Sequence, residues 1–232
     1  MNSQFRKGLL HGIPIALGYL SVSFGFGIMA VQKGLSVFSA VMISVTNLTS
    51  AGQAAGVEII AAAGPLLEMA LTQLIINIRY SLMGISLSQK LDKSFTTPHR
   101  LIASYGITDE IFAVSSAQIH PVTPAYMYGL ILISFLGWAS GTFLGAAAGE
   151  ILPSMITNAM GIVLYGMFIA IIIPPSRKER SVLFVVGVAA LVSVLFKYVF
   201  TGISVGFAVI ISACIAAAVG ALLFPVKEEY DG

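Results

Sequence analysis

The stretch from Val37 to Ala63, VFSAVMISVTNLTSAGQAAGVEIIAAA, decides how this chain folds. It is long and apolar enough to enter a lipid bilayer, yet small and polar residues interrupt its middle, from Thr46 to Gln53. Such a break exposes backbone groups that lipid does not hydrogen-bond, so it must be enclosed by protein or line a watery cavity. Many transporters build a substrate site from half-helices that meet near the bilayer midplane. The stretch therefore indicates a carrier of a small solute.

The composition excludes a water-soluble protein. Hydrophobic residues make up 57% of the chain and charged residues 9%, whereas soluble domains have roughly 45–50% and about 25%. We therefore expect a single polytopic membrane transporter domain over residues 1–232, with the lipid bilayer as its surroundings. The net charge of +2 is too small to indicate a nucleic acid partner.

The positions of basic residues predict the topology. The basic clusters at Arg6–Lys7, Lys90–Arg100 and Arg177–Arg180 belong in the cytoplasm by the positive-inside rule. Three apolar stretches separate each pair of clusters, but an even number of crossings is required, so one stretch of each three should not cross. A full crossing that leaves one cluster outside is the alternative. The apolar stretches are Leu9–Val31, Val37–Ala63, Pro65–Leu87, Ile102–Ile119, Tyr126–Gly149, Met155–Ile173, Val182–Phe200 and Val205–Phe224.

The two exceptions are the interrupted Val37–Ala63 and the short, acidic Ile102–Ile119. The predicted fold is thus an all-α integral membrane protein with about six full transmembrane helices and two interrupted or re-entrant helical segments. Both termini would lie in the cytoplasm.

Arg79 is the single residue that most strongly indicates a functional site, because a charge well inside a span is retained only with a partner or a function. Its helix is expected to be polar on two opposed faces, with Arg79 on one and Asn77 on the other, and so to run through the interior of the bundle. Both residues are assigned to substrate binding. The alternative is structural: Arg79 pairs with a buried carboxylate and locks helices together.

In the first break, Thr49 or Ser50 suits the cap of a half-helix that begins near Ala51, and Gly52 lets a ligand approach the backbone. Free N–H groups at such a helix start favour an anion such as an α-carboxylate. Gln53 would add a hydrogen bond. We therefore assign Ser50, Ala51, Gly52 and Gln53 to substrate binding, with an ordinary packed kink as the alternative.

Asp109 and Glu110 follow Thr108, and the three residues are typical of a helix start. Inside a cavity, one of the two carboxylates would bind an ammonium group or carry a coupling proton. Glu58 is a further candidate for the proton. At the membrane surface, helix capping alone would explain the motif.

Signatures of enzymes and cofactors are poor. The three histidines are scattered, no Cys/His ligand cluster occurs, and no glycine-rich phosphate loop is present. We therefore expect no enzyme activity, no metal and no cofactor.

With these residues placed, the chain resembles the AzlC family of branched-chain amino acid permeases. The resemblance rests on the order and spacing of short motifs: Gly12-Ile13-Pro14, Gly18-Tyr19, Gly25, Ala51-Gly52-Gln53-Ala54-Ala55, Asn77-Ile78-Arg79-Tyr80, Gly84, Ser86-Leu87, Thr108-Asp109-Glu110 and Phe112-Ala113. One departure concerns the break, which usually resembles Gly-Ala-Ser-Gln-Phe in the family and is Ser50-Ala51-Gly52-Gln53-Ala54 here. A pocket lined by these side chains would be roomier and less polar.

The resemblance implies a secondary transporter subunit that exports or exchanges branched-chain or similar amino acids across a bacterial inner membrane. It also implies a small hydrophobic AzlD-type membrane partner. We expect transport to be proton-coupled. The competing interpretations are a passive amino acid channel and a membrane scaffold subunit.

Overall fold

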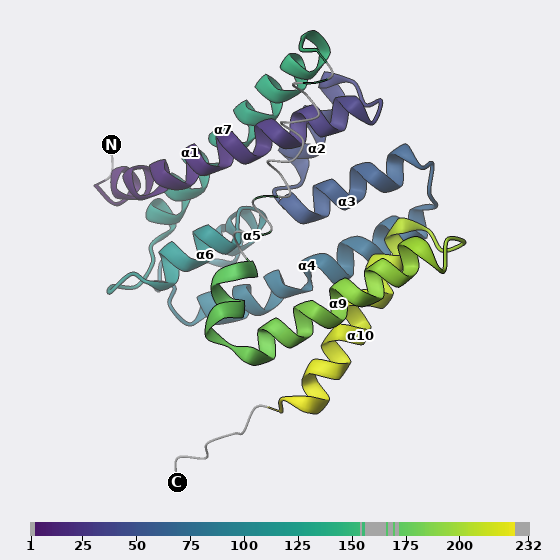
Figure 1. Ribbon diagram of the computed structural model, residues 1–232. Helices are drawn as coiled ribbons and strands as arrows, with labels where there is room; N and C mark the ends of the chain where they lie inside the picture. The colour runs from purple at the N-terminus through teal and green to yellow at the C-terminus, as the bar shows by residue number, and fades with distance from the viewer. Residues whose placement is uncertain (1–2, 154, 156–165, 167–168, 170–171, 226–232) are drawn as a thin grey trace. The chain divides into compact units, whose positions relative to one another are not determined.

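The computed structural model describes residues 3–153, 155, 166, 169 and 172–225, and these residues are helical apart from turns, loops and one isolated bridge between Leu91 and Val122. The predicted all-α membrane fold is confirmed. The helices in Figure 1 are α1 (Ser3–Gln32), α2 (Val37–Thr46), α3 (Ser50–Ala61), α4 (Leu66–Ser88), α5 (Thr97–Tyr105), α6 (Asp109–Ser116), α7 (Pro124–Ile151), α9 (Arg180–Tyr198) and α10 (Val205–Leu223).

Among the described residues, four helices are long and apolar enough to cross a membrane: α1, α7, α9 and α10. Helix α4 has 23 residues, enough for a crossing, but its polar side chains keep it out of that group. The predicted span Met155–Ile173 lies largely outside the described residues.

Both predicted interruptions are present. The chain leaves helical geometry at residues 47–49, and it turns there so that α3 does not continue the axis of α2 (Figure 1). The second segment is broken at residues 106–108, between α5 and α6, which have nine and eight residues. Helices this short do not span a bilayer of about 30 Å.

The chain divides into two compact units. The first contains residues 1–57 and 76–164, and the second contains residues 58–75 and 165–232. Helices α3 and α4 each contribute to both units. Each unit is described by itself below.

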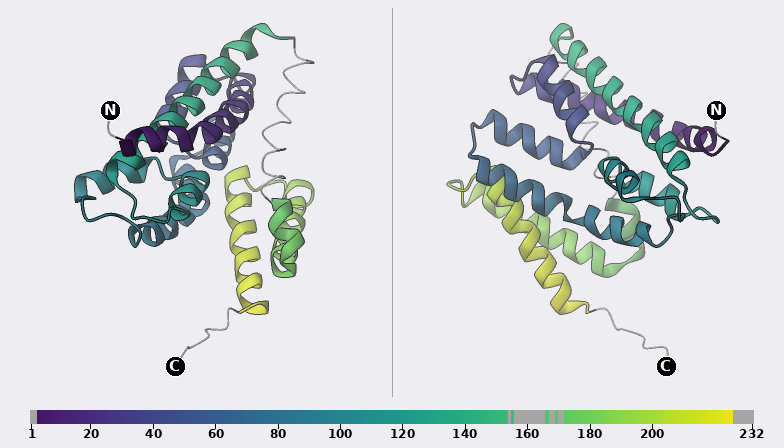
Figure 2. Two further views of the ribbon diagram at one scale, coloured as in Figure 1. Left: turned by 90° about the vertical axis from the view of Figure 1, so that its left-hand side faces the viewer. Right: turned by 180° about the vertical axis from the view of Figure 1, so that it is seen from behind.

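In the first unit, α1 and α7 lie side by side along most of their length (Figures 1 and 2). Glycines make this contact possible, because a Cβ atom at Gly137, Gly141 or Gly145 would lie within 2.4 Å of an atom of α1. Gly27 of α1 in turn faces the backbone of α7. Small residues that let two backbones approach closely are typical of tight helix pairs in membranes.

The core of the first unit lies where the two interrupted segments meet the α1–α7 pair. Leu48 from the first break is 5% exposed and Ile111 at the start of α6 is fully buried. They share one apolar cluster with Tyr19 of α1 and Trp138 of α7. Both breaks are therefore anchored by apolar side chains against the same helix pair.

In the second unit, α9 and α10 lie side by side (Figure 2). They pack at Gly220, where an added Cβ would meet the Val185 side chain at 2.7 Å. Helix α10 also receives the start of α4, through Glu68 and Thr72.

The prediction that α4 runs through the interior of the bundle stays a prediction. In the half of α4 that belongs to the first unit, Ile78, Leu82 and Ile85 are 57%, 68% and 63% exposed among the described residues. Their spacing places them on one stripe between the face of Arg79 and the face of Asn77. Two polar faces thus leave a third face that is apolar and open.

Candidate functional site

Side chains hydrogen-bond part of the backbone at the first break. The last four carbonyls of a helix lack partners inside the helix, and one of those of α2, at Val45, accepts the Tyr105 hydroxyl. The Thr46 hydroxyl donates to the Met42 carbonyl, one turn earlier, at 2.7 Å. The break is therefore held by α5 of the second interrupted segment as well as by its own residues.

Gln53 completes this arrangement from α3. Its side-chain nitrogen donates to the Asn47 carbonyl and, at 3.5 Å, to the Ile43 carbonyl. Its side-chain oxygen accepts the indole N–H of Trp138 at 3.2 Å. The residue is 1% exposed. In this structure Gln53 closes the break, and a substrate would have to displace these bonds to reach it.

The predicted cap of the first break differs in detail. Helix α3 begins at Ser50, and the Thr49 hydroxyl donates to the Asn47 side-chain oxygen at 2.7 Å. Ser50 and Ala51 are partly exposed in the first turn of α3, whereas Gly52 is buried. Their assignment to substrate binding stays a prediction.

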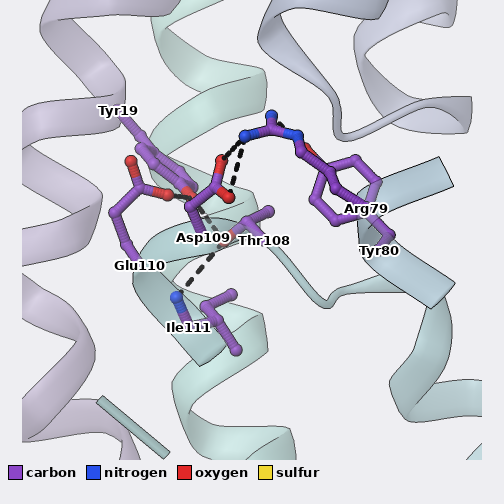
Figure 3. Close-up of polar contacts among 7 residues, drawn as sticks. All are labelled: Tyr19, Arg79, Tyr80, Thr108, Asp109, Glu110 and Ile111. Carbon is purple, nitrogen blue, oxygen red and sulfur yellow. Dashed lines mark hydrogen bonds and ion pairs between the residues drawn. The ribbon is translucent and has the colours of Figure 1, made fainter. Parts of the chain in front are cut away.

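The second break ends with the motif expected from the sequence. Thr108 is the N-cap of α6, and its hydroxyl oxygen accepts the Ile111 N–H at 3.3 Å. Gly106, the C-cap of α5, faces Ile131 so closely that an added Cβ would lie 2.4 Å from its side chain. The helix start thereby presents Asp109 and Glu110 from its first turn, as Figure 3 shows.

Arg79 and Asp109 form an ion pair. One terminal nitrogen of the guanidinium, Nη1, lies 2.9 Å from Oδ1 and 2.8 Å from Oδ2 of Asp109 (Figure 3). The other, Nη2, donates to the Tyr80 hydroxyl at 3.3 Å. The two side chains are 42% and 37% exposed. Because one nitrogen serves both carboxylate oxygens, the two-nitrogen fork of Arg79 is not used on Asp109.

Glu110 is engaged differently from its neighbour. The Tyr19 hydroxyl of α1 lies 2.5 Å from Glu110 Oε2 and 2.5 Å from Thr108 Oγ1. Figure 3 shows Glu110 and Asp109 leaving α6 towards different partners, Tyr19 and Arg79. The two adjacent acids thus sit in distinct surroundings.

Trp138 and Tyr19 connect the two breaks. The rings meet edge to face, with centroids 5.2 Å apart, and the two residues are 3% and 7% exposed. Through them, Gln53 of the first break is linked to Glu110 of the second. Sequence reasoning missed Trp138, although it is the single tryptophan of the chain, and it gave Tyr19 no role.

The two remaining predicted residues, Asn77 and Glu58, lie on α4 and α3. Asn77 precedes Arg79 by two positions, which places it about 200° around α4 from the arginine. Glu58 lies on α3 within the second unit. Their assignments stay predictions. Among the described residues, no group of three or more His, Cys, Asp or Glu side chains is arranged to hold a metal ion.

An apolar cavity lies beside the second break. It is bordered by Ile107, directly before the Thr108 cap, and by Gly84 of α4. The other lining residues are Leu87, Ser88, Leu91, Phe95, Arg100, Ala103, Ser104 and Met127. The cavity therefore offers a mainly hydrocarbon surface at the second break, and its lining does not include Arg79, Asp109 or Glu110.

These features define a polytopic all-α membrane protein whose two interrupted helices carry a polar cluster. Comparison with known proteins identifies its family. The model of the family described as AzlC protein matches residues 14–152. The chain belongs to the AzlC family.

Relatives cover most of the chain. A membrane protein of Archaeoglobus fulgidus is 32% identical over 183 residues, which are 78% of this chain and 80% of that protein. Inner membrane protein YgaZ of Escherichia coli is 27% identical over 236 residues, 98% of this chain and 95% of its own length. The branched-chain amino acid transport protein AzlC of Bacillus subtilis is 25% identical over 183 residues, 77% and 70% of the two chains. No solved structure matches this chain.

Proposed function

We propose that this protein is the transport subunit of a secondary transporter for branched-chain or similar amino acids. It exports or exchanges them across a bacterial inner membrane, coupled to protons, and is not an enzyme. The name of the Bacillus subtilis relative supports the substrate class, and that of the Escherichia coli relative supports the location.

The ion pair of Arg79 and Asp109 is the observation that carries the proposal. An amino acid is a zwitterion, so its carboxylate can take the place of Asp109 at the guanidinium while its ammonium group pairs with Asp109 or Glu110. The pair is more than one-third exposed on both sides, so a solute can reach it. When the substrate binds, the Arg79–Asp109 pair is replaced by two pairs, one at each end of the zwitterion. Every charge keeps a partner, which limits the free-energy cost of placing charges inside a membrane protein.

The unused fork of Arg79 supports carboxylate binding. Planar guanidinium groups bind carboxylates through two parallel hydrogen bonds. The Asp109 contact runs through Nη1 alone, and Nη2 reaches only the neutral Tyr80 hydroxyl at 3.3 Å. A substrate carboxylate would bind both nitrogens through two parallel hydrogen bonds, an arrangement that Asp109 does not make in this structure.

The apolar cavity supports a hydrocarbon side chain on the substrate. Its lining by Leu87, Phe95, Ile107 and Met127 suits a branched aliphatic group. Burial of such a group contributes about 0.8 kcal/mol for each CH₂. This term would favour leucine, isoleucine and valine over smaller amino acids.

The open apolar stripe of α4 suits a lipid or a partner helix. We include in the proposal a small hydrophobic AzlD-type membrane partner, and a topology with both termini in the cytoplasm. Both rest on the family and on the positions of basic residues, and they are tested separately from the site.

Replacement of Arg79 by lysine tests the site. Lysine keeps the charge but loses the planar fork, so Arg79→Lys should still reach the membrane while leucine flux into vesicles falls about tenfold or more. The matched control is Arg180→Lys at the start of α9, which should transport like the unmodified protein. Flux would be measured with labelled amino acids in vesicles that contain both chains.

Four results would contradict the proposal. Normal transport by Arg79→Lys would show that the fork does not bind a carboxylate. Loss of the protein from the membrane would favour a structural ion pair. In the unmodified protein, flux without saturation or proton coupling would indicate a passive channel, and absence of any flux would indicate a scaffold subunit.

A further inference from the structure

A second buried acid lies outside the cluster described above. Glu68 is in the first turn of α4, within the second unit, and is 2% exposed. A buried carboxyl group in a membrane protein is rare and is retained with a partner or a function.

The charged form of Glu68 is held by the start of α10. Its Oε1 atom accepts the Ser204 hydroxyl at 2.6 Å and the Gly206 backbone N–H at 2.8 Å. Ser204 is the N-cap of α10 but makes no cap bond with its own side chain. A carboxylate from α4 thus performs the capping, and the positive end of the α10 dipole favours its negative charge.

A second oxygen points to the same place without a partner. Thr72, one turn after Glu68, is fully buried, and within the described part of the chain its hydroxyl has no hydrogen-bond partner. A Cβ atom at Gly206 would lie 2.4 Å from Glu68 Oε1 and 2.8 Å from Thr72 Oγ1. The missing side chain of Gly206 therefore lets both oxygens face the backbone of α10.

The Thr72 hydroxyl has no partner in the described part of the chain, so its oxygen is available to accept a hydrogen bond. A neutral Glu68 has an O–H group to donate, and a rotation of its side chain away from Ser204 and Gly206 would direct that group to Thr72.

We propose that Glu68 and Thr72 form a proton-binding site that carries the coupling proton of transport. The proton adds to the carboxylate of Glu68, the resulting O–H donates to Thr72, and the hold of Glu68 on α10 weakens. Release of the proton restores the cap. The site is distinct from Asp109 and Glu110, and the inference rests on the proposed function.

The surroundings of Glu68 favour a proton-binding role over an ion pair, because its described partners are uncharged. Its described contacts on α10 are uncharged, and the titratable residue on that helix is Cys214. Gly64 is its neighbour from the turn before α4, and Glu58 is the titratable residue of the preceding α3. On α9, Lys197 lies over the Tyr198 ring, 5.6 Å from its centre.

The test separates proton coupling from substrate binding. Glu68→Gln keeps the shape and an acceptor oxygen for Ser204 and Gly206 but removes the titrating group. In proteoliposomes that contain the full chain and its partner, accumulation of labelled leucine driven by a pH gradient should fall about tenfold or more. Counterflow exchange at equal pH on both sides should stay within about twofold of the unmodified protein.

Thr72→Val provides a second variant, and Glu150→Gln, on the exposed end of α7, is the control. Thr72→Val removes the acceptor for the neutral acid while keeping the volume, so gradient-driven uptake should need a lower pH than in the unmodified protein. The control should change neither assay.

Equal loss of counterflow and accumulation in Glu68→Gln would overturn the proposal and leave Glu68 as a helix cap. Unchanged accumulation in Glu68→Gln would also overturn it, as would an unchanged pH dependence in Thr72→Val. If Glu68→Gln does not reach the membrane, the pH dependence of Thr72→Val decides. Absence of both activities in the unmodified protein would instead contradict the proposed function.

Discussion

At the scale of single residues, the two neighbouring acids of α6 have different partners. Asp109 meets a cation, Arg79, whereas Glu110 meets a hydroxyl, Tyr19. The Tyr19 ring is also packed edge to face against Trp138. Tyr19 therefore has two roles: its hydroxyl hydrogen-bonds Glu110, and its ring packs in the contact between α1 and α7. A mutation that removes only the hydroxyl separates them.

Tyr19→Phe keeps the ring against Trp138 and removes only the hydroxyl. The charged form of Glu110 then loses a hydrogen bond, which is worth about 1.5–3 kcal/mol for a charged group. If transport needs this hydrogen bond to Glu110, leucine flux should fall about tenfold in Tyr19→Phe. The flux would be measured as the initial rate of labelled leucine transport in vesicles.

The Glu110→Gln background supplies the control for this loss. There, adding Tyr19→Phe should lower the leucine flux no further, because the charged acceptor of the hydrogen bond is already removed. A further loss of the same size in that background would assign the effect to another group. Unchanged flux in the single variant Tyr19→Phe would show that the hydrogen bond to Glu110 is not needed.

At the scale of elements, the α1–α7 pair is the platform on which both breaks rest. Tyr19 of α1 and Trp138 of α7 reach Glu110 and Gln53 respectively. Gly141 lies one turn beyond Trp138, where an added Cβ would be 2.4 Å from the Leu20 carbonyl oxygen. Separation of the two helices at this point would disturb both breaks at once.

Gly141→Ala should therefore destabilise the protein. The methyl group would press on backbone, which cannot move aside like a side chain, and such overpacking costs about 1–3 kcal/mol. Gly18→Ala on α1 is the matched control, because its Cβ would meet no heavy atom within 4 Å and alanine favours a helix by about 0.5–1 kcal/mol. Thermal unfolding in detergent should show a lower midpoint for Gly141→Ala only. Equal midpoints for the two variants would contradict the close contact.

At the scale of the whole molecule, the match to the AzlC family and the division into units nearly coincide. The match ends at residue 152, which is the C-cap of α7. Helices α9 and α10 lie beyond it and belong to the second unit. The first unit thus contains the family's matched helices, apart from the part of α3 and α4 assigned to the second unit.

The predicted topology can be tested on exposed loops. In a variant with Cys214 replaced by serine, a cysteine at Lys93 should react only with a reagent that enters the cell, because the Lys90–Arg100 loop is predicted to be cytoplasmic. A cysteine at Ala62, between α3 and α4, should react with an impermeant reagent from outside. Labelling of Lys93→Cys from outside would make α2 and α3 a full, kinked crossing.

The sequence by itself determined the features that depend on local chemistry. Low charge and long apolar stretches predicted a helical membrane protein, and the polar residues 46–53 located the break that the structure has at residues 47–49. The Thr108 cap and the small-residue face of α7 were also predictable. Helix length, capping and periodicity are set by residues a few positions apart, so one sequence suffices to recognise them.

Only the tertiary structure decided which polar groups are partners. Asp109 meets Arg79 from 30 positions away, and Tyr19 meets Glu110 across 91. The same is true of Gln53, which binds Trp138 and the end of α2, and of Glu68, which caps a helix that begins 137 residues later. Such pairings depend on how helices pack against one another, and in a chain with few charged groups each partner is chosen by proximity in the fold, because burial of an unpaired charge is costly.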